Sequence, residues 1–153
     1  MSLQTQLVFR LDVDLDLPIE VGETYVGMRR VIPITGGSVE GSQIRGRVLP
    51  GGADWNVVRP DGVVHLWARY TIETDDGVPI VVTNEGFQQG PPDTMQRILA
   101  GLPFDKSQWY ARTRPVFEVG NSRYDWLNRF VFVGDLLPPT DPKKVSIEIH
   151  KVL

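Results

Sequence analysis

The stretch VHLWARYTIETDDGVPIVVT, residues 64–83, decides the fold. Within it Leu66, Ala68, Tyr70 and Ile72 recur at every second position and fall on one face of an extended chain, with polar residues between them. This alternation is typical of a half-buried β-strand. The sequence DDG at 75–77 is a tight-turn signature that leads into a second apolar run. Residues 64–84 therefore predict a β-hairpin.

The same alternation extends outward in both directions along the chain. It predicts a first strand over residues 7–15, a last strand over 145–152, and further strands near 31–35, 38–49, 54–59, 109–118 and 129–134. The Pro-rich segment 136–144 is expected to be a loop before the last strand.

Only one segment has the spacing of a helix. It opens at PPD, residues 91–93; Met95, Ile98 and Leu99 share a face, and Gly101 is expected to end it. Short strands separated by Gly and Pro are typical of a sandwich or a barrel. Because most strands carry one clean apolar face, we expect a mainly β fold. It would be a single closed antiparallel β-barrel of about eight or more strands with one short helix, forming one domain over 1–153. A barrel of about eight strands has room for packed side chains or for one small ligand.

Composition narrows the classes of function. The net charge is −3 and the basic residues are scattered, so nucleic acid and anionic membranes are not expected partners. No apolar run approaches the roughly 20 residues that span a bilayer, and the first ten residues lack the pattern of a signal peptide. The chain has no Cys, which excludes thiolate nucleophiles and thiolate metal sites. A cytoplasmic protein is expected.

Six motifs in order give the chain a family resemblance. They are GGSVEG (36–41), RGRVLPGGADW (45–55), RPDG (59–62), ARYTIETDDG (68–77), RTRPVFEVG (112–120) and YDWLNRFVFVG (124–134). Together they resemble the domain of unknown function family 3237, also called uncharacterised protein family 0311, over roughly residues 5–150. The resemblance implies a small β-barrel of lipocalin-like appearance. It implies no reaction, because a fold does not determine chemistry.

Asp54 and Trp55 form the first candidate pair. A carboxylate in a dry barrel would have a raised pKa and could act as a catalytic acid or base. Alternatively, Asp54 follows Gly51-Gly52 and could instead cap a turn. Trp55 would line the ligand site or pack at the rim. The alternation does not decide which face Asp54 takes.

Three further polar residues are candidates on the central strands. Tyr70 shares its face with aliphatic residues, so its hydroxyl needs a partner, either another barrel residue or a ligand carbonyl. Asn84 shares a face with two aliphatic residues of its own strand and is a second inward candidate. Arg112 would clamp a ligand carboxylate at the barrel mouth or lie solvated outside.

The stretch YDWLNR, residues 124–129, is the last candidate. Trp126 and Asn128 are two residues apart and would point the same way in an extended segment. They would then offer an aromatic wall and an amide to a ligand. The alternative is a barrel corner filled by aromatic side chains, with Asn128 bonded to the backbone.

The sequence lacks the residue patterns of several other kinds of active site. His65 and His150 are the only histidines and lie opposite the aliphatic face of their strands, so no metal site is expected. No nucleophile-elbow, phosphate-loop or dinucleotide fingerprint is present, and no cofactor is expected.

Three functional hypotheses follow. The leading one is a small-molecule enzyme without cofactor, of isomerase, lyase or cyclase type, acting on a mid-sized metabolite with a carbonyl or carboxylate. Asp54 and Tyr70 would be catalytic, and Trp55, Asn84, Arg112, Trp126 and Asn128 would bind the ligand. The alternatives are a non-catalytic carrier of a hydrophobic metabolite and a structural assembly domain. Apolar residues such as Trp67 on an outer face favour a homodimer.

Overall fold

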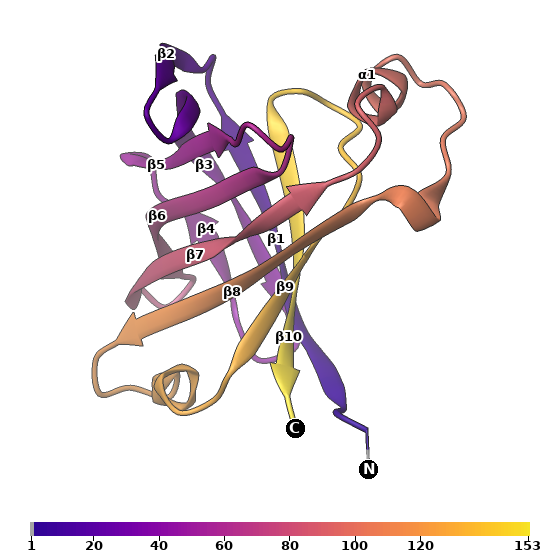
Figure 1. The fold of residues 1–153 in the computed structure, drawn as a ribbon. Coiled ribbons are helices and arrows are strands. Elements are labelled where there is room, and N and C mark those ends of the chain that lie inside the picture. Colours follow the sequence, from indigo (N-terminus) through magenta and orange to yellow (C-terminus); the bar gives the residue numbers. More distant parts are fainter. Residues whose placement is uncertain (1) are drawn as a thin grey trace.

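The computed structural model describes residues 2–153. It contains ten strands and three short helical segments (Figure 1). The strands are β1 (Thr5–Leu15), β2 (Ile19–Thr24), β3 (Gly27–Gly41), β4 (Arg45–Val48), β5 (Gly52–Val58), β6 (Val64–Thr74), β7 (Pro79–Gln89), β8 (Tyr110–Val119), β9 (Phe132–Leu136) and β10 (Lys144–Val152). The helical segments are α1 (Thr94–Leu99), η1 (Lys106–Gln108) and η2 (Asp125–Asn128).

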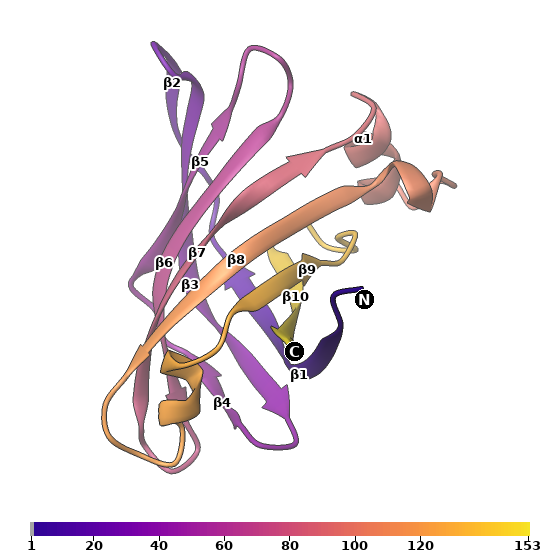
Figure 2. The ribbon, with the colours of Figure 1, turned by 60° about the horizontal axis from the view of Figure 1, so that its bottom comes forward.

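Eight of these strands close into an antiparallel barrel, as the sequence predicts. Each strand pairs with the next in the order β1, β3, β5, β6, β7, β8, β9, β10, and β10 pairs back with β1. The two additional strands lie off this ring: β2 pairs with β3, and β4 bridges β3 and β6. Figure 2 shows the barrel wall from a second direction.

The long strand β3 allows the ring to close. Its first half pairs with β5 over residues 28–34, and its second half pairs with β1 over residues 34–41. In the second half, Gly37 has φ of 142° and pairs with Val13, and a Cβ at Gly37 would lie 2.1 Å from the carbonyl oxygen of Asp12. Only glycine fits this close approach.

The hairpin predicted over 64–84 is confirmed. Strands β6 and β7 pair from Val64↔Gln88 to Glu73↔Pro79, and the Gly77 amide donates to the Thr74 carbonyl across the turn. Leu66, Tyr70 and Ile72 are buried, as the alternation requires.

Aromatic side chains fill one end of the barrel interior. Phe117 packs between Phe9 and Phe132 at centroid distances of 5.7 and 5.1 Å, and Trp126 of η2 lies 6.0 Å from Phe132. Both chain termini lie toward this end, whereas α1 lies at the opposite end (Figure 1). The opposite half of the barrel is therefore the part that can remain hollow.

Two local predictions need correction. The helix spans only Thr94–Leu99, and Ile98 is buried while Leu99 is exposed, so its apolar face is narrower than expected. The segment 124–128 is not extended but ends in the 3₁₀ turn η2, and β9 begins only at Phe132. None of the described helices has the length and apolar character needed to cross a membrane.

Candidate active site

The hollow half of the barrel contains a cavity of about 180 Å³ with two different walls. Strands β9, β10 and β1 supply an aliphatic wall. Strands β3, β5, β6, β7 and β8 supply the polar groups, which are Arg30, Asp54, Asn56, Tyr70, Asn84, Gln88 and Thr113. A mostly apolar pocket with a few convergent polar groups is the usual form of a small-molecule site.

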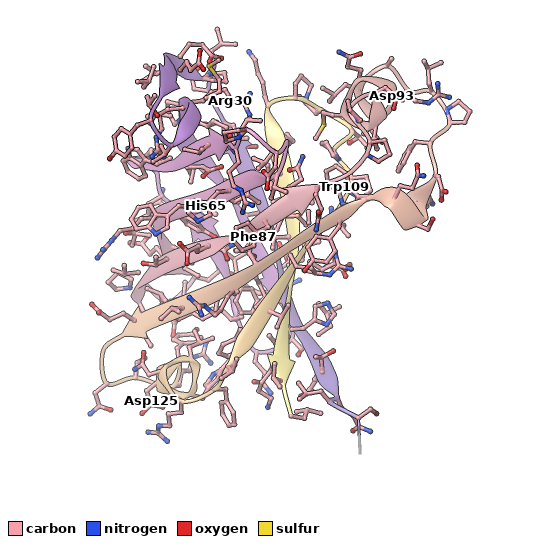
Figure 3. All side chains as sticks on the ribbon, in the orientation of Figure 1. Arg30, His65, Phe87, Asp93, Trp109 and Asp125 are labelled. Atoms are coloured by element: carbon pink, nitrogen blue, oxygen red, sulfur yellow. The ribbon has the colours of Figure 1, made fainter. Side chains whose placement is uncertain are left out.

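A second chamber of about 340 Å³ adjoins the cavity. Arg30, Gln88 and Met95 border both chambers. The outer chamber, which we call the vestibule, is enclosed by residues 15–18, by α1 and Trp109, and by the loop 137–143. Figure 3 shows Arg30, Asp93 and Trp109 toward the same end of the barrel, far from Asp125. A ligand can therefore reach the cavity from the α1 end.

Asp54 lies in β5 and faces this cavity. It pairs with Ala68 on β6 and is the last paired residue before a gap in the β5–β6 pairing, which resumes at Val57↔His65. Its Oδ1 accepts the backbone N–H of Trp67 at 2.9 Å, and its Oδ2 accepts Nδ2 of Asn56 at 3.4 Å. Asp54 thus satisfies a backbone donor, as the turn-cap alternative proposed, but does so within the strand and inside the barrel.

The surroundings of Asp54 disfavour its charged form. Burial raises the pKa of the Asp54 carboxyl above its ordinary value, and the hydrogen bonds from Trp67 and Asn56 and the positive charge of Arg30 only partly oppose this effect. Arg30 is linked to the carboxyl through one amide, since its Nη2 donates to Asn56 Oδ1 at 3.3 Å. The raised pKa is the property that a catalytic acid or base needs near neutral pH.

Four buried polar atoms have no hydrogen-bond partner among the described residues. They are Arg30 Nε, Tyr70 Oη, Asn84 Oδ1 and Thr113 Oγ1, and all four belong to residues that line the cavity. A buried polar group without a partner costs about 1–3 kcal/mol. Burial raises the pKa of Tyr70, and the neighbouring Asn84 side chain opposes this only in part. Because the two side chains do not reach hydrogen-bond geometry, the Tyr70 hydroxyl stays protonated and available as a donor. Because the four atoms lie around one cavity, they are candidates for binding a ligand there.

Strand register arranges these groups in three levels along the barrel axis. Arg30 pairs with Asn56 nearest the vestibule, Asp54 lies two residues deeper on β5 and is level with Asn84 through Ala68, and Tyr70 lies two residues beyond Ala68 on β6. Small residues leave the room they need. A Cβ at Gly134 would lie 2.2 Å from Thr113 Oγ1, and one at Gly52 would lie 2.5 Å from the Tyr70 Cβ.

The structure brings together three of the predicted site residues: Asp54, Tyr70 and Asn84. Trp55 and Arg112 were predicted to bind ligand, but the structure places neither of them in the cavity. Trp55 is on the outer face of β5, 40% exposed and edge-on to Trp67 at 5.7 Å, because alternation sends it opposite Asp54. Arg112 also points outward, where its Nη1 donates to Asp135 Oδ1 at 2.6 Å. The homodimer through the Trp67 face stays a prediction.

Trp126 and Asn128, which were also predicted to bind ligand, do not line the cavity either. Trp126 packs against the aromatic end of the barrel. Asn128 bonds both to the amide of Val119 at 3.0 Å and to its carbonyl at 2.8 Å. The alternative expectation, a barrel corner filled by aromatic side chains, describes this segment. A 3₁₀ turn replaces the extended geometry in which both side chains would have pointed the same way.

Sequence reasoning missed Arg30, Asn56, Gln88 and Thr113. For two of them, the alternation along the strand could have indicated an inward side chain. Asn56 shares the face of Asp54 by simple alternation, and Thr113 must face inward once Arg112 faces outward. Arg30 gave no such signal, because it lies in an Arg29-Arg30 pair and the predicted strand began one residue later.

One group of possible metal ligands lies away from the cavity. Single ligand atoms of Asp135, Glu148 and His150 lie within 4.8 Å of one another on β9 and β10. Asp135 already forms its ion pair with Arg112, so a cation would compete with a guanidinium for that carboxylate. The other histidine, His65, pairs with Glu85 at 3.1 Å on the outer face of the barrel (Figure 3).

Comparison with known proteins places the chain in a family. The model of the family described as "Protein of unknown function (DUF3237)" matches residues 3–152. The chain belongs to the DUF3237 family. A UPF0311 protein of Rhodopseudomonas palustris is 41% identical over 152 residues, which cover 99% of this chain and 98% of the relative. The resemblance deduced from the six motifs is thereby confirmed.

Solved structures of DUF3237 relatives have the same barrel. A conserved protein of unknown function from Rhodopseudomonas palustris is 40% identical with a TM-score of 0.90, covering 100% of this chain and 99% of that one. A β-barrel-like protein from Acinetobacter baumannii is 34% identical with a TM-score of 0.85, covering 100% and 98%. An enzyme from Penicillium herquei, 18% identical with a TM-score of 0.74 and coverage of 100% and 96%, shares the fold alone.

Proposed function

We propose that this DUF3237 barrel is a cofactor-independent acid/base enzyme of isomerase, lyase or cyclase type. Its substrate would be a mid-sized metabolite that carries a carbonyl or carboxylate. One observation carries the proposal: a buried carboxyl with a raised pKa shares one cavity with four polar atoms that no described residue satisfies.

Asp54 is the proton-transferring group in this proposal. As the carboxylate it would take a proton from a carbon next to a carbonyl, or from a hydroxyl that then attacks within the same molecule. It would return the proton to another atom of the product. The bonds from Trp67 and Asn56 hold the carboxyl in one orientation. A positioned acid or base is worth on the order of 10²–10⁴ in rate.

Tyr70 and Asn84 would hold the reacting oxygen. The Tyr70 hydroxyl is a donor and would bond to the carbonyl oxygen, whose negative charge grows as the proton leaves. Asn84 presents an acceptor, Oδ1, to a hydroxyl of the substrate. Both are buried, so these bonds form where water competes little.

The carrier hypothesis has one observation in its favour. The wall formed by Val13, Leu15, Leu136, Val145 and Ile147 is aliphatic and suits a hydrophobic ligand without chemistry. A carrier does not require a buried carboxyl, however, and an assembly domain does not require a cavity.

A thermal-shift screen against a metabolite library tests the proposal. Ligands that bind the folded state raise its melting temperature, and each hit is incubated with protein and followed by NMR for product. We expect turnover by the wild type and by Asp135→Asn, a control carboxyl on the outer wall, but not by Asp54→Asn. Hits that bind wild type and Asp54→Asn equally and yield no product with either would favour a carrier.

A further inference from the structure

Arg30 differs from the other polar residues of the cavity because it carries a permanent charge. It lies at the level nearest the vestibule and borders both chambers. Its Nη2 donates to a neutral amide oxygen of Asn56, and its buried Nε has no partner among the described residues. No carboxylate in the described part of the chain lies within ion-pair distance of it.

The guanidinium of Arg30 therefore has no direct ion-pair partner at the junction of the two chambers. A guanidinium stays protonated at every accessible pH and presents its donors in a planar fork that matches a carboxylate. Asp54 does not serve as its counter-ion, since Asn56 stands between them. The other buried polar groups without a partner, those of Tyr70, Asn84 and Thr113, are all neutral.

We propose that Arg30 forms an anion subsite at the junction of cavity and vestibule, and that the substrate is an oxo- or hydroxycarboxylate. Its carboxylate binds Arg30, and its uncharged oxygen binds Tyr70 and Asn84 deeper in the barrel. This proposal rests on the proposed function, because it places Asp54 between the two ends of the substrate. A second anionic group at the deep end would meet no cation.

The register limits the length of such a substrate. Arg30 pairs with Asn56, which is two residues from Asp54 on β5, and Asp54 pairs with Ala68, which is two residues from Tyr70 on β6. The two steps together make four residues along the strands, which is about 13 Å at roughly 3.3 Å per residue. The carboxylate and the distal oxygen are therefore separated by no more than about that distance.

Paired ligands that differ only in charge test the subsite. The probes are levulinic, benzoylpropionic and benzoylvaleric acids, each with its primary amide, titrated calorimetrically at neutral pH. We expect at least one acid to bind the wild type about 10- to 100-fold more tightly than its amide, the usual range for a hydrogen bond to a charged group. A panel in which no acid binds more tightly than its amide overturns the proposal.

Two arginine variants identify the residue responsible. Arg30→Met keeps the length of the side chain and should abolish the preference for acid over amide, while Arg30→Lys should retain part of it. Arg29→Met is the matched control, because Arg29 is the adjacent residue and donates to the Trp55 carbonyl on the outer wall. Circular dichroism confirms that each variant is folded. An acid preference that persists in Arg30→Met assigns the anion to another group and overturns the proposal.

Asp54→Asn separates this inference from the proposed function. It should keep the preference for acids, because Arg30 remains in place, while losing turnover. Turnover that survives in Asp54→Asn refutes the acid/base role and leaves the anion subsite standing.

Discussion

Two buried tyrosines provide a matched comparison of a site residue with a structural one. Tyr70 and Tyr124 are 4% and 1% exposed, so both phenols are removed from water. The Tyr124 hydroxyl donates to Asp76 Oδ1 at 2.6 Å and accepts from Arg123 Nη2 at 2.6 Å. The Tyr70 hydroxyl has no partner among the described residues. Removing the two hydroxyls should therefore change stability in opposite directions.

Tyr70→Phe should raise the free energy of unfolding by about 1 kcal/mol, the lower end of the cost of an unpaired buried hydroxyl. Tyr124→Phe should lower it by about 1–2 kcal/mol, because it removes hydrogen bonds and leaves their partners without the hydroxyl. In a chain of this size each kcal/mol shifts Tm by roughly 2–4 °C. The two variants should thus differ by about 4–12 °C in calorimetry.

Urea unfolding of the same variants supplies the control, since an unchanged m-value shows that only stability has changed. A loss of stability in Tyr70→Phe as large as that in Tyr124→Phe would refute the reasoning. It would mean that the Tyr70 hydroxyl already forms a hydrogen bond in the folded protein and is not free to bind a ligand.

Three further predictions follow from the geometry. Asp54→Asn should raise the free energy of unfolding near neutral pH, because burial raises the pKa of the Asp54 carboxyl in the folded state. This gain in stability should fade as the pH falls toward the ordinary pKa of 3.8, since Asp54 is then protonated in both the folded and the unfolded state. An equal gain at low pH would contradict the prediction. Gly134→Ala should lower the free energy of unfolding by about 1–3 kcal/mol in urea, since its Cβ would lie 2.2 Å from Thr113 Oγ1. An unchanged free energy of unfolding would mean that the Thr113 side chain moves freely. Arg112→Met should lower the free energy of unfolding by no more than about 1 kcal/mol, as expected for an exposed ion pair. It should leave ligand affinity unchanged in calorimetry. A weaker affinity would mean that Arg112 contributes to the ligand site.

The barrel was predictable because its signals are local. Alternation in β1, β6 and β10 and the DDG turn each depend on a few neighbouring residues. Period two also gave the inward face of Tyr70 and Asn84 directly, since each has aliphatic neighbours two residues away on the same strand.

The rest of the site depends on contacts between distant strands. Asp54 was ambiguous because it follows a glycine turn, and its inward face is fixed only by the pairing of β5 with β3 and β6. Arg112 was misplaced because outward and inward arginines have the same sequence appearance until the partner, Asp135, is known. Arg30 belongs to the cavity because the β3–β5 register places it beside Asn56, a contact between strands that the sequence does not show.

The measurement that tests the central claim most directly is hydrogen exchange from carbon in a bound ligand. A carbonyl compound that the screen identifies is incubated in D₂O with wild-type protein or with Asp54→Asn, and deuterium uptake next to the carbonyl is followed by NMR. The account predicts uptake accelerated by the wild type, and a rate lower by on the order of 10²–10⁴ with Asp54→Asn. Equal rates with the two proteins, at equal occupancy of the cavity, would contradict it.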